Sequence, residues 1–334
     1  MSIDPTERVP VGRTRLSVTR FGLGTTAIGN LFQPVAEATA AATVETAYAE
    51  GVRFFDTAPL YGHGLAERRV GSSLAGRSPE EYTLATKVGR LLRPGAPPEP
   101  GQVVDGRHIF RDVPPDGPVF DFGYDGVRRS LEESLRRLRL DRVDILHIHD
   151  PDDHPAQALG EAYVALDDLR AQGVIGAVGA GMNQADMLVR FAREADFDCF
   201  LIAGRYSLLD QSAGRELLPV CAEKRIAVFV GGVYNSGLLA DPRPGATYDY
   251  RPADDERLRL ARRIAEVCGR HDVPVKAAAL QFPFGHPAVT SVLVGARSPG
   301  EVAENIRMLR QPIPGDLWVE LRAEGLLAEG VPAP

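Results

Sequence analysis

Four polar side chains in this sequence each follow or end an apolar run of strand length. Asp56 and Tyr61 lie in Phe-Phe-Asp-Thr-Ala-Pro-Leu-Tyr, Lys87 ends Leu-Ala-Thr-Lys, and His149 ends Val-Asp-Ile-Leu-His-Ile-His. A neighbouring ammonium group favours the phenolate and so lowers the pKa of a Tyr. Lys87 would supply that charge, Asp56 would hold Lys87, and His149 would hydrogen-bond a substrate oxygen or relay its proton. Together the four residues predict proton transfer at a carbonyl or alcohol oxygen.

Each of these residues also has an ordinary structural interpretation. A Tyr after a strand is usually a packed edge residue, and an Asp at a strand end often caps the next helix. The catalytic interpretation depends on the strand ends being neighbours. An α/β barrel places its chemistry at the carboxyl ends of adjacent strands, so the elements that carry the four residues must be identified.

Short β-branched runs alternate with amphipathic stretches along most of the chain. The expected strands are 20–25, 54–58, 82–88, 143–149, 175–181, 199–205, 227–233 and 291–296. The expected helices are 38–50, 65–74, 124–138, 158–172, 184–194, 214–224, 254–271 continuing to about 285, and 299–309. Eight repeats of strand and helix predict an α/β fold of the (β/α)₈ TIM barrel type. A doubly wound open sheet is the alternative, but it usually has fewer strands.

Three segments fall outside the repeat, and none of them indicates a domain boundary, so we expect one barrel domain over 1–334. Residues 1–19 predict an N-terminal β-hairpin at the bottom of the barrel. Residues 90–122, rich in Pro and Gly, predict a long substrate loop over the mouth. Residues 312–328 predict an additional C-terminal helix that carries the single Trp of the chain.

Composition narrows the classes of partner. The 334-residue chain has a net charge of −7, which argues against a nucleic-acid partner. Its three Cys residues form no metal-type pair and no disulfide framework, so a reducing cytoplasm is expected. The polar N-terminus lacks a signal-peptide core, and no apolar run is long enough to span a membrane. A small-molecule substrate is therefore expected, and the sequence does not define the oligomeric state.

A phosphate site is expected on the rim, where barrels often build one from the loops after strands seven and eight. Ser236, Gly237 and Leu238 follow the seventh expected strand. Gly295, Arg297 and Ser298 follow the eighth and precede a helix. Ordinary turns are also rich in Gly and Ser, so the residue types alone do not decide between the two interpretations.

A metal site is a further alternative, because His147 and His149 lie on one face of a strand. None of the other His residues ends a later strand, so a metal there would lack ligands and no metal is expected. We assign His147 a structural role and His149 a catalytic one.

Taken together, the motifs resemble the aldo-keto reductase family over nearly the whole chain. The matching segments run from Gly22-Leu-Gly-Thr25 through Phe55-Asp-Thr-Ala58, Tyr61-Gly62, Thr86-Lys87, Asp144, His149 and Asn183 to Gly295-Ala-Arg297 and Glu304-Asn305. The resemblance implies a barrel that binds NAD(P) without a Rossmann fold. It implies that Asp56, Tyr61, Lys87 and His149 form the catalytic tetrad. The cofactor residues that we assign are Gly24, Thr25, Asn183, Ser236, Gly237, Leu238, Gly295, Arg297, Ser298, Glu301 and Asn305.

Finer features resemble one branch of that family, the D-threo-aldose 1-dehydrogenases, which include L-fucose and L-galactose dehydrogenases and have pyridoxal 4-dehydrogenases as close kin. The segments 203–211, 231–239 and 278–287 carry this likeness. Two positions depart from the wider family: Gly231 stands where many members stack a Tyr on the nicotinamide, and Ala203 stands where many have a Gln that binds the carboxamide.

The cofactor is expected to be NAD, with NADP possible. Many NADPH-dependent members have a basic residue where this chain has Glu301, whose carboxylate would repel a 2′-phosphate. Arg297 argues for NADP because it could pair with that phosphate.

The expected activity is oxidation of an aldose, of the L-fucose, D-arabinose or L-galactose type, at C1 to a lactone, with Tyr61 as acid–base. Pyridoxal 4-dehydrogenation and general NADPH-dependent carbonyl reduction are the enzymatic alternatives. A nucleotide-sensing subunit without activity is a further alternative, against which the complete tetrad argues. The sequence leaves the substrate, the nucleotide and the preferred direction of the reaction open.

Overall fold

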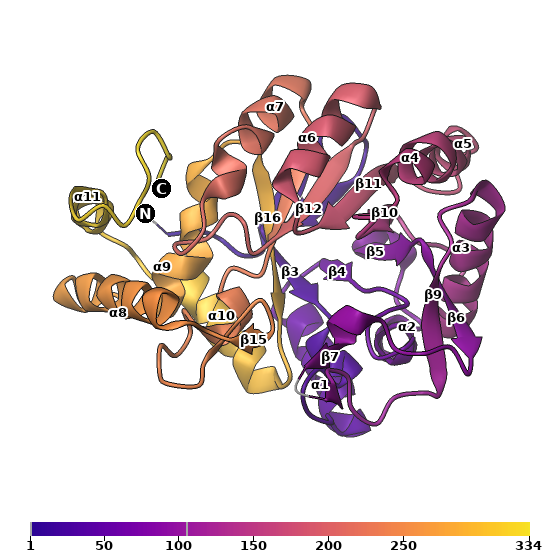
Figure 1. The fold of residues 1–334 in the computed structure, drawn as a ribbon, viewed down its shortest axis with the longest axis horizontal. Helices are drawn as coiled ribbons and strands as arrows, with labels where there is room; N and C mark the ends of the chain where they lie inside the picture. The colour runs from indigo at the N-terminus through magenta and orange to yellow at the C-terminus, as the bar shows by residue number, and fades with distance from the viewer. Residues whose placement is uncertain (1, 105) are drawn as a thin grey trace.

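A closed barrel of eight parallel strands forms the centre of the computed structural model, which describes residues 2–104 and 106–334 (Figure 1). The barrel strands are β3 (Phe21–Gly24), β4 (Phe54–Asp56), β5 (Thr83–Val88), β10 (Ile145–His149), β11 (Ala177–Met182), β12 (Cys199–Ala203), β13 (Ala227–Gly231) and β16 (Val289–Gly295). Each predicted strand corresponds to one of these, so the (β/α)₈ prediction is confirmed.

Helices surround the barrel in the same alternating order (Figure 1). They are α1 (Glu37–Ala49), α2 (Leu65–Leu74), α3 (Tyr124–Leu138), α4 (Pro155–Gln157), α5 (Tyr163–Ala171), α6 (Ala185–Glu194), α7 (Leu217–Lys224), α8 (Asp255–Arg270), α9 (Val275–Gln281), α10 (Pro299–Arg310) and α11 (Gly315–Ala323). Within this set, no helix of the described residues is both long and apolar enough to cross a membrane.

The strands are apolar on both faces because the helices cover the outside and the barrel fills its own interior. The lower interior is closed by the N-terminal hairpin of β1 (Arg8–Pro10) and β2 (Ser17–Thr19), which pair antiparallel. Val9 and Val18 of this hairpin pack with inward-facing side chains such as Phe54 and Phe229. The predicted hairpin at the bottom of the barrel is therefore confirmed.

The segment 90–122 differs from the expected open loop. Its ends pair as an antiparallel hairpin of β6 (Arg90–Pro94) and β9 (Asp116–Phe120), and a second small hairpin of β7 (Val103–Val104) and β8 (Arg107–His108) lies between them. Ile109 and Phe110 pack against Leu31 and Tyr61. Backbone pairing and this apolar contact anchor the segment, whereas its many Pro and Gly residues had suggested a loop without regular structure.

Two predicted helix boundaries are wrong. The expected helix from 254 to about 285 is two helices, because α8 ends at Arg270 and Asp272 adopts a left-handed φ of 56° before Pro274. The C-terminal helix α11 covers Gly315–Ala323 rather than 312–328. A third small hairpin, β14 (Thr247–Tyr248) with β15 (Arg251–Pro252), was not predicted at all.

Candidate active site

Asp56 and Lys87 form a buried ion pair at the carboxyl ends of β4 and β5. These strands pair in parallel with Asp56 opposite Ala85, so Lys87 lies two residues farther on and on the same face. Lys87 Nζ lies 2.8 Å from Asp56 Oδ1, 2.7 Å from Oδ2 and 2.9 Å from the carbonyl oxygen of Thr57. The Lys87 side chain is 1% exposed. Solvent can therefore neither replace nor screen this pair.

The electrostatics of the pair keep Lys87 cationic. Burial lowers the pKa of Lys87, but the charges of Asp56 and Tyr61 outweigh burial and leave that pKa above its ordinary value. Burial also raises the pKa of Asp56, against the opposing pull of Lys87. The result is a fixed positive charge inside the rim of the barrel.

Tyr61 lies over this charge, with Lys87 Nζ 4.7 Å from the centre of the phenol ring. Its ring is perpendicular to that of His149, with the centroids 5.8 Å apart. Burial raises the pKa of Tyr61 above its ordinary value, and Lys87 lowers it by less than burial raises it. The sequence-based expectation of a lowered pKa is thus wrong for the unliganded chain, because it left out desolvation.

His149 ends β10 and is 6% exposed. Burial lowers the pKa of His149 well below its ordinary value, and the charges of Arg90 and Lys87 lower it further. Its backbone carbonyl accepts a hydrogen bond of 2.8 Å from Arg90 Nη1. A neutral imidazole held in this way can donate or accept one hydrogen bond at a substrate oxygen.

His147 lies deeper in the barrel than His149 and does not join it at the rim. It is fully buried, and neither ring nitrogen has a hydrogen-bond partner among the described residues. A Cβ on Gly179 of the neighbouring strand would lie 2.3 Å from His147 Nδ1, so the glycine makes room for the ring. Within the described part of the chain, no three His, Cys, Asp or Glu side chains gather as a metal ion would require.

A cavity of about 530 Å³ opens beside Asp56 and Tyr61. Among the residues assigned from the sequence, its lining includes Asp56, Tyr61, Gly24, Asn183, Ser236, Gly237, Gly295, Arg297, Glu301 and Asn305. Five assigned residues are not part of the lining: Lys87 and His149 of the tetrad, and Thr25, Leu238 and Ser298. Thr25 is buried with its hydroxyl on the carbonyl of Asp56, Leu238 is fully buried, and Ser298 caps α10.

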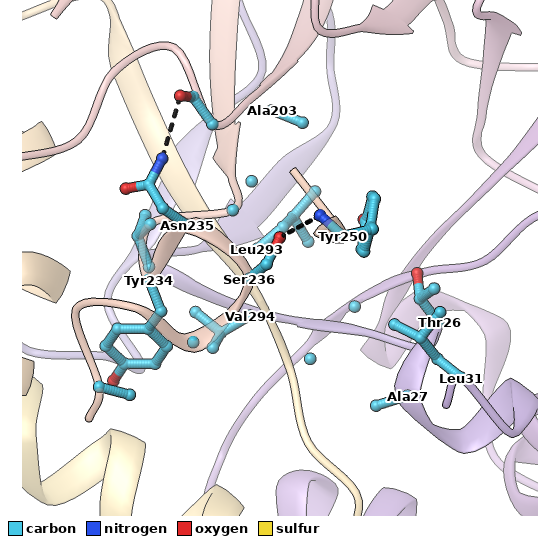
Figure 2. A pocket seen from close by; sticks show the side chains of 18 of the residues that line it. Thr26, Ala27, Leu31, Ala203, Tyr234, Asn235, Ser236, Tyr250, Leu293 and Val294 are labelled. Carbon is cyan, nitrogen blue, oxygen red and sulfur yellow. Dashed lines mark hydrogen bonds between the residues drawn. The ribbon is translucent and has the colours of Figure 1, made fainter. Parts of the chain in front are cut away.

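The cavity has two walls that come from distant parts of the chain. Figure 2 shows Thr26, Ala27 and Leu31 on one side and Tyr234, Asn235 and Ser236 on the other, with Tyr250 between them. The β14–β15 hairpin brings Tyr250 to this place: the Tyr250 N–H donates to Ser236 Oγ at 3.1 Å, and Thr247 Oγ1 donates to the Ser236 carbonyl at 2.8 Å. The Tyr250 ring lies 6.0 Å from that of Phe32 across the opening.

Sequence reasoning missed Tyr250 and its neighbour Asp249, as well as Tyr234 and Lys276, all of which line the cavity. The run Thr-Tyr-Asp-Tyr-Arg at 247–251 places aromatic residues around a carboxylate in a loop. This composition could have indicated a binding loop. Lys276 and Glu304 lie on α9 and α10 and form a 3.0 Å ion pair, which no local pattern reveals.

The far end of the cavity lies at the N-terminus of α10. Ser298 Oγ accepts from the Glu301 N–H, and Glu301 Oε2 accepts from the Arg297 N–H at 2.8 Å. Arg297 Nε is buried without a partner among the described residues. Gly237 has a φ of 100° and open space where a Cβ would stand. An unpaired guanidinium donor and the open space at Gly237 fit a nucleotide phosphate, so these residues fit a bound dinucleotide.

Comparisons with known proteins agree with the fold. The model of the aldo/keto reductase family matches residues 20–323, and the chain belongs to this family. It is therefore an NAD(P)-dependent oxidoreductase.

The relatives include a D-threo-aldose 1-dehydrogenase of a Pseudomonas species, 42% identical over 93% of this chain and 95% of the relative. A pyridoxal 4-dehydrogenase of Microbacterium luteolum is 40% identical over 98% of this chain and all of the relative. The holo form of an aldo-keto reductase from Bacillus halodurans has a TM-score of 0.76 and 25% identity, covering 98% of both chains.

Proposed function

We propose that this enzyme oxidises an aldose at C1 to the corresponding lactone, with NAD⁺ as the preferred acceptor. The observation that carries the proposal is the buried Asp56–Lys87 pair beneath Tyr61, with a neutral His149 perpendicular to the phenol ring. The 42% identity to a D-threo-aldose 1-dehydrogenase supports the choice of substrate class.

The protein side of the reaction follows from these positions. In its phenolate form Tyr61 accepts the proton of the anomeric hydroxyl and becomes a neutral phenol, and Lys87 stabilises the phenolate from which this step begins. Asp56 holds Lys87 in place. His149 hydrogen-bonds the reacting oxygen and orients it. A bound nicotinamide nucleotide supplies the acceptor for the hydride.

Pyridoxal is the second candidate substrate, because a pyridoxal 4-dehydrogenase is 40% identical to the chain. Its reacting group is an aldehyde in its cyclic hemiacetal form on an aromatic ring, and the same four residues could act on it. A pyridine ring would need an apolar face, and Phe32 and Tyr250 offer one across the opening.

The assay measures NAD⁺ reduction with L-fucose, D-arabinose, L-galactose and pyridoxal, together with Tyr61→Phe. We expect turnover of at least one aldose. We also expect a loss of about 10²- to 10⁴-fold in kcat for the variant, as is typical when a general acid–base is removed. Dinucleotide affinity should be unchanged. NADPH-driven aldehyde reduction without aldose oxidation would favour a carbonyl reductase, and equal turnover of parent and variant would remove the enzymatic role of Tyr61.

The preference for NAD⁺ rests on Glu301. Its carboxylate accepts the Arg297 N–H at the N-terminus of α10, where an anion would otherwise bind. A 2′-phosphate near it would meet like charge. Arg297 keeps a free Nε for a phosphate of either nucleotide.

Glu301→Gln tests this preference by the Kd of NAD⁺ and NADP⁺ for the unliganded protein, measured by calorimetry. We expect NADP⁺ to bind about 10-fold more tightly than to the parent, with little change for NAD⁺, because one like charge is removed. Glu256→Gln is the matched control, since Glu256 lies in the first turn of α8 and does not line the cavity. An unchanged ratio of the two Kd values would show that Glu301 does not discriminate between the nucleotides.

A further inference from the structure

Asp150 follows His149 at the rim of the barrel, and its constrained backbone fixes the position of its carboxylate. Its φ of 42° lies in the left-handed region, which residues other than Gly adopt rarely. Its N–H donates to the carbonyl of Gly181 on the neighbouring strand at 3.0 Å. Residues that the surrounding structure holds in a left-handed conformation are common at functional sites, so Asp150 is a candidate functional residue.

One carboxylate oxygen of Asp150 is already engaged. Oδ2 lies 3.3 Å from Arg90 Nη2 and 3.4 Å from His149 Nε2. Arg90 is itself paired with Glu99, at 2.7 Å through Nε and 3.2 Å through Nη2, so Asp150 is not needed to balance its charge. Among the described residues no donor reaches Oδ1, and the side chain is 34% exposed. Oδ1 is therefore a free acceptor.

The charge of Asp150 lies near the reacting groups. Burial raises the pKa of Tyr250, and the charges of Tyr61 and Asp150 raise it further. Burial also raises the pKa of Asp150, to about 6, with Arg90 and Lys87 opposing the rise and Asp152 and Glu99 adding to it. Asp150 is thus mostly ionised at neutral pH and lies beside His149, although no step of the proton transfer uses it.

We propose that Asp150 accepts a hydrogen bond from the hydroxyl on the carbon next to the reacting carbon, and so selects α-hydroxylated substrates. This inference rests on the proposed aldose oxidation. His149 Nε2 is the group proposed to bind the reacting oxygen, and Asp150 Oδ2 lies 3.4 Å from this nitrogen, so the Asp150 carboxylate is placed to meet a hydroxyl on the neighbouring carbon.

This contact also orients the sugar ring. An anomeric carbon has a hydroxylated carbon on one side and the ring oxygen on the other. An ionised carboxylate only accepts hydrogen bonds, and a ring ether oxygen has no proton to donate. Asp150 therefore binds the C2 side of the ring and excludes the reversed pose, in which the ring oxygen would leave a desolvated carboxylate without a partner.

The test compares substrates that differ by one hydroxyl, in the parent, Asp150→Asn and Asp153→Asn. D-Arabinose and 2-deoxy-D-ribose form the pair for oxidation with NAD⁺, and glycolaldehyde and acetaldehyde form the pair for reduction with NADH. Asp153 is an exposed carboxylate of the same loop and serves as the matched control. Thermal unfolding and the Kd of the dinucleotide establish that each variant is folded.

We expect Asp150→Asn to lower kcat/KM for the hydroxylated member of each pair by about 10- to 100-fold, the value of one charge-assisted hydrogen bond. The deoxygenated member should change by no more than about 3-fold, within the margin of a surface substitution. Asp153→Asn should leave both members unchanged.

The outcomes separate this inference from the proposed function. A parent that oxidises no aldose defeats the proposed function, whereas the glycolaldehyde and acetaldehyde pair still decides the role of Asp150. Equal losses on both members of a pair, or complete inactivity of the folded variant, would overturn selection by Asp150, because the residue would then act on the chemistry itself. A parent that acts on neither D-arabinose nor glycolaldehyde overturns both.

Discussion

Replacing Asp150 by Asn should make the protein more stable at neutral pH. The folded structure raises the pKa of this carboxyl from 3.8 to about 6, mainly by burial. A carboxyl that binds its proton more tightly in the folded protein destabilises the native state at every pH at which the carboxyl is ionised. The destabilisation is absent below about pH 4, grows as the pH rises to about 6, and is complete above that value. Asn removes the charge and tolerates the left-handed φ of 42° as Asp does.

The magnitude follows from the shift. About two pKa units correspond to about 3 kcal/mol at most. The side chain is 34% exposed, so solvent screens part of this effect, and about 1 kcal/mol is the realistic gain. For a chain of 334 residues, this free energy raises the Tm by about 1–2 °C.

Calorimetric unfolding of the parent and of Asp150→Asn without ligand, at several pH values from 5 to 8, measures this difference. Ligand must be absent because bound dinucleotide stabilises both proteins by mass action. The variant should gain most at pH 8 and least at pH 5, while Asp153→Asn should follow the parent. A variant that is less stable than the parent at pH 8, or a gain that does not shrink towards pH 5, would refute the desolvation argument.

Other substitutions test the remaining parts of the structure. Asp56→Asn should destabilise the fold by about 3–5 kcal/mol in urea unfolding, because it leaves Lys87 buried without its charge partner; a change below about 1 kcal/mol would contradict the burial of this pair. Gly71→Ala should lower the free energy of unfolding by about 1–3 kcal/mol, since its Cβ would lie 1.8 Å from the carbonyl oxygen of Leu138. Gly160→Ala should be neutral or stabilising, because the space around Gly160 is open. Aldose oxidation should become faster from pH 7 to 10. Burial places the pKa of Tyr61 above its ordinary value of 10.0, so the fraction of phenolate, the base form of Tyr61, increases over this whole range. A flat pH–rate profile of kcat would contradict this.

The parts of the fold that depend on local pattern could be predicted from the sequence. The eight barrel strands are short and mostly apolar, and α2 and α3 begin and end at the predicted residues. The predictions that failed depend on contacts between distant segments. The pairing of β6 with β9 joins residues more than twenty positions apart, and the β14–β15 hairpin is positioned by hydrogen bonds to Ser236.

The candidate site divides in the same way. Asp56 and Lys87 could be placed together because neighbouring parallel strands bring their ends to one rim, and the structure does place them in contact. The net pKa shift of Tyr61 could not be predicted, because it depends on how deeply the ring is buried. Asp150 was missed since its role depends on a free Oδ1 and on the orientation of Arg90, and neither is visible in Val-Asp-Ile-Leu-His-Ile-His-Asp.

The two consequences of Asp150 have one physical cause. A carboxylate that water fully solvates would not destabilise the fold, but it would also gain little by exchanging water for a sugar hydroxyl. Partial burial makes Asp150 unfavourable in the unliganded protein and therefore makes a substrate hydroxyl an effective partner for Oδ1. If this reasoning holds, Asp150→Asn must increase stability and decrease selectivity together. Substitution of a residue that only supports the fold would decrease both. The direction of the two changes in a single variant thus distinguishes a substrate-binding carboxylate from a structural one.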